Sequence, residues 1–218
     1  MNSSSKMEID EDESRPFDLS PWVTGLLSLA IYMLMIIAKH QFLISQDQLL
    51  SEYTGDDFEK YMSATNLFRA FKYVFIALFF LGGILLTFLV LSGANFFLSI
   101  NLTPKQLLNV SILSSVGDSI QELFIIVWFA TGTTFQTTEV FNFYPLSVFS
   151  LLTKSEDIIF PASYVLQSLN LFLFIKLFLI GYAYYATTEK GLAQSFRDAF
   201  YSYLLPLLGL YGLLYYVV

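Results

Sequence analysis

The sequence predicts an all-α fold, a polytopic bundle of five transmembrane helices. Hydrophobic residues make up 56% of the 218 residues and charged residues only 13%, whereas soluble domains usually carry about 25% charged residues. The apolar residues also form runs long enough to span a bilayer, which takes about 20 residues. The charges gather in an acidic tail and between these runs. We therefore expect the lipid bilayer to surround most of the chain.

Residues 1–20 are expected to form a disordered tail, and residues 21–218 the transmembrane domain. Much of the net charge of −7 lies in the tail, where Asp10–Glu13 is a continuous acidic run. Such a segment cannot bury enough apolar surface to fold. Because acidic residues repel phosphates, nucleic acid is not expected as a partner. The chain has no cysteine, which excludes disulfides and thiolate metal sites.

The first span is expected over residues 22–44. Ser20 suits a helix cap and Pro21 the first helical turn. Near the other end, Lys39 and the single histidine, His40, are expected to extend to the membrane interface.

A polar loop is expected over residues 45–66, part of which could be a short helix. The second span is expected over residues 71–93. The pair Gly82-Gly83 lies in its middle, and we interpret it as a notch for close helix packing.

The third span is expected over residues 104–130. Thr103 is a suitable N-cap and Pro104 a suitable first helical residue. This span is the most polar of the five, so it cannot face lipid on all sides and should be the central helix. Its polar residues are Asn109, Ser111, Ser114, Ser115, Asp118, Gln121 and Glu122.

The fourth and fifth spans are expected over residues 161–187 and 199–218. The apolar stretch 141–152 is too short to span, and re-entrant and interfacial positions are both open for it. Pro206 is expected to kink the fifth span, whose Gly209 and Gly212 could pack against a neighbour. Lys and Arg residues are equally numerous on the two predicted sides of the membrane, so the positive-inside rule does not set the orientation of the chain.

Three ionisable residues inside the spans form a candidate intramembrane polar site. Asp118 and Glu122 are four residues apart on one helix, so they share a face. A charge at the bilayer centre costs at least about 2.5–3.5 kcal/mol. We therefore expect Lys176 of the fourth span to pair with one or both carboxylates. The amides of Asn109, Gln167 and Asn170 could join this polar core.

Two interpretations of this site remain open. Charged residues within spans often mark an ion or proton pathway. They can also form a pair or triad that fixes helix register. The second interpretation is favoured because no repeats or broken half-helices of the transporter type are evident.

Sequence motifs of enzymes are missing, so no catalytic residues, metal site or cofactor are expected. The chain has no P-loop, GxGxxG, HExxH or GxSxG motif. Asp118 is the only aspartate within a span, which argues against an intramembrane aspartyl protease with two catalytic aspartates.

Two stretches of the sequence carry a family resemblance. Asn101–Val116 (NLTPKQLLNVSILSSV) resembles the loop and third helix of the Yip1 family of five-span membrane proteins. Leu169–Phe200 is similar to the family's fourth helix, short hairpin and fifth-helix start, with Gly181 and the run Lys190–Ala193 at matching places. The resemblance covers residues 65–218 and is closest to the bacterial branch.

The chain also departs from the family pattern. The family often has a proline where this chain has Val116–Asp118, and an aspartate and a tryptophan near Asn170 and Lys176. The resemblance does not account for the buried charges.

The resemblance implies a non-enzymatic protein that organises or assists other membrane components. Eukaryotic relatives act in vesicle trafficking and contact small GTPases. It also implies a cytoplasmic N-terminus, location in the inner membrane for a bacterial chain, and association with itself or with protein partners. A small transporter or ion-conducting protein and an accessory subunit of a larger complex are the alternatives.

Overall fold

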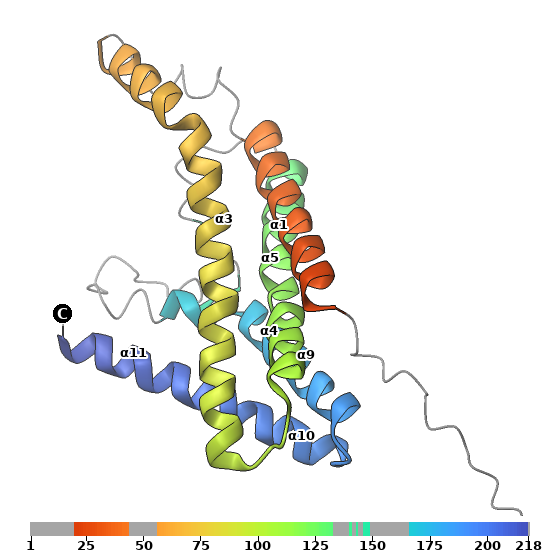
Figure 1. Cartoon of the computed structure of the whole chain (residues 1–218). Coiled ribbons are helices and arrows are strands. Elements are labelled where there is room, and N and C mark those ends of the chain that lie inside the picture. Colours follow the sequence, from red (N-terminus) through yellow and green to blue (C-terminus); the bar gives the residue numbers. More distant parts are fainter. Residues whose placement is uncertain are drawn as a thin grey trace, which may run out of the picture.

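The computed structural model describes residues 20–43, 56–132, 140, 143, 146–148 and 166–217, and its regular elements are helices (Figure 1). Three helical stretches are long and apolar enough to cross a membrane: Pro21–Leu43, Phe71–Leu98 and Pro104–Thr131. Leu171–Thr187 is a shorter apolar helix. The predicted all-helical class is confirmed for the described residues. The count of five spans stays a prediction, and the tail expected over residues 1–20 lies almost wholly outside the described residues.

The first helix, α1 (Pro21–Leu43), begins where the sequence predicts. The Ser20 carbonyl accepts hydrogen bonds from the Val23 and Thr24 amides at 3.0 and 3.2 Å. Pro21, which has no N–H to satisfy, occupies the first turn.

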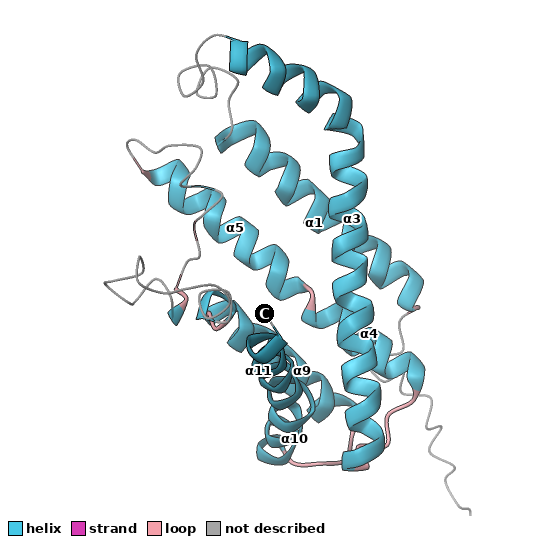
Figure 2. Cartoon of the chain, turned by 90° about the vertical axis from the view of Figure 1, so that its left-hand side faces the viewer, coloured by secondary structure: helices cyan, strands magenta, loops and turns pink. Residues whose placement is uncertain are grey.

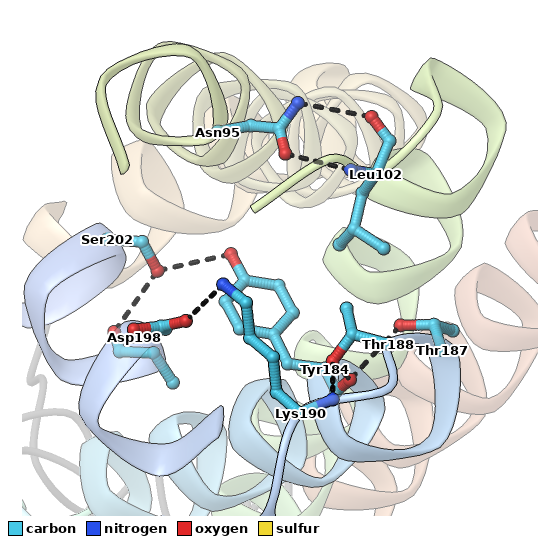
Figure 3. Close-up of polar contacts among 9 residues, drawn as sticks. Asn95, Leu102, Tyr184, Thr187, Thr188, Lys190, Asp198 and Ser202 are labelled. Atoms are coloured by element: carbon cyan, nitrogen blue, oxygen red, sulfur yellow. Dashed lines mark hydrogen bonds and ion pairs between the residues drawn. The ribbon is translucent and has the colours of Figure 1, made fainter. Parts of the chain in front are cut away.

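The second helix, α3 (Asp56–Leu98), is longer than expected. The prediction of a loop was wrong from Asp56 onward, and residues 45–55 lie outside the described part. No glycine or proline occurs between Asp56 and Phe71, so nothing interrupts the helix where its composition turns polar. At its other end, the Asn95 side chain bonds to both the N–H and the carbonyl of Leu102, at 3.0 and 3.1 Å (Figure 3). These two bonds close the turn into the next helix.

Helix α4 (Pro104–Ser114) begins with a complete capping box. The Gln106 amide donates to Thr103 Oγ1 at 3.3 Å, and the Thr103 amide donates to Gln106 Oε1 at 2.9 Å. The sequence prediction of this helix start is confirmed. Each bond satisfies a backbone N–H that the helix itself leaves free.

Replacing Thr103 with alanine is expected to lower the free energy of unfolding by about 1 kcal/mol, because it removes this cap. The measurement is SDS-induced unfolding of the purified chain in detergent micelles. Thr131→Ala is the matched control, since the Thr131 hydroxyl bonds only to carbonyls of its own helix, Val127 and Trp128. A Thr103 variant as stable as the control would contradict the role of the cap.

The third span is divided into two helices, α4 and α5 (Val116–Thr131), which meet at Ser115. The predicted span is confirmed as one apolar helical stretch, Pro104–Thr131, with an irregular turn at Ser115, whose backbone stays in the right-handed helical region and whose N–H still bonds to the Ser111 carbonyl at 3.3 Å. Ser115 Oγ donates to the Ile112 carbonyl at 2.6 Å, and the Ser115 carbonyl accepts the Asp118 amide at 3.0 Å. Serine hydroxyls that bond nearby carbonyls compete with the regular helical pattern.

The α4–α5 stretch is the central one, as predicted. In the most apolar 18-residue segment of this stretch, 44% of the residues are buried, whereas the corresponding segments of α3 and α1 are 22% and 11% buried. The main apolar cluster joins α4 to α3, α9 (Leu171–Thr187) and the C-terminal helices. Its most buried members include Leu91, Val110, Ile180 and Tyr184.

The fourth predicted span is broken near its start. Residues 161–165 lie outside the described part, and α9 begins only after Asn170. The Val148 amide donates to the Leu169 carbonyl at 2.9 Å, and the Leu171 amide donates to the Leu146 carbonyl at 3.3 Å. Ser147 is fully buried there. This part of the stretch 141–152 therefore pairs with the start of α9, and most of the stretch lies outside the described residues.

The C-terminal helix begins earlier than predicted, as α10 (Leu192–Ala199), followed by a π-turn, η2 (Phe200–Leu204), and α11 (Leu205–Val217). The Leu205 amide donates to the Phe200 carbonyl, five residues back, just before Pro206, which has no N–H to donate. The irregular turn thus lies beside the proline expected to kink this span. Figures 1 and 2 show α11 running crosswise to α3 rather than along it.

Four glycines expected to pack against neighbours are open instead. A Cβ at Gly82, Gly83, Gly209 or Gly212 would meet nothing within 4 Å. The described part of the chain therefore does not fill the predicted notches. Two other glycines, Gly117 and Gly181, do mark close helix contacts.

Candidate functional site: intramembrane ion pairs of helix α5

Asp118 lies in the first turn of α5 and forms an ion pair with α9. Lys176 Nζ lies 2.7 Å from Asp118 Oδ1, so the predicted pairing of these two residues is confirmed. Gly117 makes the contact possible, because a Cβ there would lie 2.7 Å from Lys176 Cγ. The aliphatic part of Lys176 therefore runs directly over the backbone of α5.

Glu122, one turn later, pairs with α1. Lys39 Nζ lies 2.5 Å from Glu122 Oε2, and each side chain is 14% exposed. The sequence analysis expected Lys39 to extend to the membrane interface and did not predict this partner. Side chains of a helix lean toward its N-terminus, so the long Lys39 chain reaches back into the bundle. Asp118 and Glu122 are one turn apart, as predicted, but their partners are on different helices.

The two ion pairs differ in the solvent exposure of their side chains. Asp118 and Lys176 have side-chain exposures of 37% and 20%, against 14% for both members of the Glu122 pair. The two carboxylates and two ammonium groups balance one another in charge. Together they connect α5 to α1 on one side and to α9 on the other.

The three amides of the predicted polar core are in two different places. Asn109 is buried in α4, where its Oδ1 accepts from Thr24 Oγ1 of α1 at 3.5 Å. Asn170 caps α9, since its Oδ1 accepts from the Leu173 amide at 3.0 Å. Its Nδ2 donates to the Gln167 carbonyl at 3.2 Å. Asn170 and Gln167 thus organise the start of α9, whereas Asn109 belongs to the α1 interface.

Serines on this interface were missed as site residues. Ser28 Oγ of α1 lies 2.9 Å from Ser115 Oγ at the irregular turn. Ser119 is 5% exposed, and its Oγ has no hydrogen-bond partner in the described part of the chain. The available sequence signal was the spacing of Ser115, Ser119 and Glu122, which places all three on one helix face.

A second polar cluster closes the hairpin between α9 and α10 (Figure 3). Lys190 Nζ lies 2.6 Å from Asp198 Oδ2, and the Tyr184 and Ser202 hydroxyls are 3.1 Å apart. The ion pair of Lys190 joins the tip of the hairpin to α10. The cluster therefore stabilises the turn that includes the run Lys190–Ala193, which resembles the family pattern.

Within the described ranges, no three His, Asp or Glu side chains come together as metal ligands would. Comparison of the chain with protein-family models, curated proteins and solved structures finds no match. The functional argument therefore rests on the geometry of the described residues.

Proposed function

We propose that the chain is a five-span, non-enzymatic membrane protein of the Yip1-like type that organises or assists other membrane components. The observation that carries this proposal is an open apolar groove on α3. Its lining residues are Phe75, Leu78, Phe79, Gly82, Gly83 and Leu86. Its volume is about 390 Å³.

The groove has the features of a membrane helix-packing surface. Phe79 is 79% exposed, and nothing lies within 4 Å of a Cβ at either glycine. Without a hydrophobic driving force in lipid, helices associate through close packing at small residues. A helix from another copy or from a partner protein fits this requirement, in line with the association that the family resemblance implies.

The ion pairs support a structural rather than a chemical role for the interior. Both carboxylates of α5 are engaged, by Lys176 and by Lys39. Removing a single partner would leave a buried charge unpaired, so the pairs fix how α1, α5 and α9 fit together. A bundle held in this way can present a constant outer surface to its partners.

The test is the effect of Gly83→Ile on association in the membrane. We expect wild-type chain to cross-link into larger complexes in native membranes and to keep them in mild detergent. Gly83→Ile should shift the chain to the monomer, because the added side chain fills the groove. Gly93→Ile is the matched control, since Gly93 is also open on α3 but does not line the groove.

The outcomes separate the alternatives. A partner that co-purifies in fixed ratio, and is lost with Gly83→Ile, would identify the chain as a subunit of a larger complex. A wild-type chain that is monomeric in native membranes would contradict the proposal.

A second candidate function is ion or proton conduction past Asp118, Glu122 and Lys176. The ion pairs that α5 makes with α1 and α9 favour it, because charged residues within spans often mark ion or proton pathways. Flux across liposomes that contain the purified chain is the measurement, and it is developed below.

A further inference from the structure

The face of α5 toward α1 carries a column of polar groups. Ser115, Ser119 and Glu122 follow one another at spacings of four and three residues, so they share this face. Ser115 contacts Ser28 of α1 at 2.9 Å, and Glu122 contacts Lys39 of α1 at 2.5 Å. Ser119 therefore lies between two established polar contacts to the same neighbouring helix.

Ser119 is the member of this column whose hydrogen bonding is incomplete. It is 5% exposed, and its hydroxyl has no hydrogen-bond partner in the described chain. An unpaired buried hydroxyl is costly, and an ordered water is the usual partner in such a case. A water at Ser119 would connect the serine pair below it to the Glu122 carboxylate above it.

The column extends beyond the serine pair toward the start of α1. Below the serine pair, Thr24 of α1 donates to Asn109 of α4 at 3.5 Å. His40, which follows Lys39, is not part of the column, because its ring packs edge-on against Tyr73 of α3, with centroids 6.2 Å apart. From Asn109 to Glu122 a helix rises roughly 20 Å, which is about two-thirds of the hydrocarbon core.

We propose that this polar column between α1 and α4–α5 is a proton-transfer path, an inference that rests on the second candidate function. A hydroxyl or water accepts a proton on one lone pair and releases its own proton to the next group. The Glu122 carboxylate accepts a proton and becomes a carboxylic acid, and it returns to the carboxylate when it donates the proton to the next group, so one proton enters and one leaves. No bond other than O–H or N–H bonds is made or broken.

The groups around Glu122 fit this role. Lys39 Nζ lies at hydrogen-bond distance from Glu122 Oε2. Asp118 is one turn away and is held by Lys176 of α9. The Lys176 side of α5 therefore balances charge, while the α1 side carries the exchangeable protons.

The geometry also determines which ion can pass. The Ser28–Ser115 and Lys39–Glu122 contacts are at hydrogen-bond distance, so no hydrated cation fits between these side chains. Protons move through hydrogen-bonded chains without such space. The path is therefore expected to conduct protons and to exclude sodium.

The test uses the purified full-length chain in liposomes with an internal pH dye and an imposed membrane potential. Wild-type chain should take up protons and no sodium. Ser119→Ala should lower the proton flux severalfold, because alanine cannot hold the bridging water. Ser195→Ala is the matched control, since Ser195 is another buried, unpartnered serine but lies in α10. Its flux should equal that of wild type.

A second variant, Glu122→Gln, should reduce the flux to that of protein-free liposomes. If the Glu122→Gln variant does not fold, the flux of the Ser119→Ala variant decides whether the path exists, because that change removes no hydrogen bond of the described fold. Sodium flux beside proton flux, or proton flux unchanged by Ser119→Ala, would overturn the path and leave the second candidate function standing. Absence of any ion flux would overturn both, and none of these results bears on association through α3.

Discussion

Replacing Lys39 with methionine is expected to lower the free energy of unfolding by roughly 3–5 kcal/mol, because a buried charge then loses its partner. Glu122 is left in the bundle interior, where its side chain is only 14% exposed. It must either take up a proton or remain charged in an apolar setting. SDS-induced unfolding in detergent micelles measures the loss.

Two comparisons test this explanation. The double variant with Lys39→Met and Glu122→Leu should recover most of the stability, since a hydrophobic pair of similar volume often replaces a buried ion pair without loss. Lys176→Met should cost less than Lys39→Met, because the Asp118 side chain it exposes is already 37% accessible. A double variant no more stable than Lys39→Met would show that the unpaired carboxylate is not the cause.

Gly181→Ala is expected to destabilise the chain by about 1–3 kcal/mol through overpacking. A Cβ at this position would lie 2.6–3.0 Å from three ring atoms of Phe196. The ring also packs against Phe178 of α9, with centroids 5.3 Å apart. A shift of the ring to make room would therefore disturb a second contact between α9 and α10. Thermal unfolding in detergent measures the effect.

The matched variants make this prediction specific. Gly93→Ala, at an open position of α3, should be neutral or slightly stabilising, because alanine favours helix over glycine. Combining Gly181→Ala with Phe196→Leu should cost less than the sum of the two single changes, since the smaller side chain makes room. Additive losses would mean that the two residues do not compete for the same space.

Local rules predicted the ends of helices better than their continuity. Ser20-Pro21 and Thr103-Pro104 start helices where expected, because caps depend on neighbouring residues alone. The irregular turn at Ser115 was not predicted. Serine within a helix is ordinary, and the spacing of residues does not show that this one bonds to both Ile112 and Ser28.

The candidate site was likewise predicted only in part. The lysine partner of Asp118 was identified because few ionisable residues lie within the apolar runs and a charge there needs an opposite charge. The partner of Glu122 was missed because Lys39 lies at a predicted span end, where lysines usually face the interface. Which carboxylate meets which lysine depends on helix rotation, and residue spacing along one helix does not give it.

By itself, the sequence determined that this chain is helical and apolar enough for a membrane, and that its third apolar stretch is central. These properties follow from composition and run length, since lipid accepts only segments whose backbone bonds are satisfied internally. The tertiary structure decided the pairing of Glu122 with Lys39, the open groove of α3 and the crosswise course of α11. Each of these depends on how whole helices are rotated and tilted against one another, because contacts between distant segments are set by packing in three dimensions.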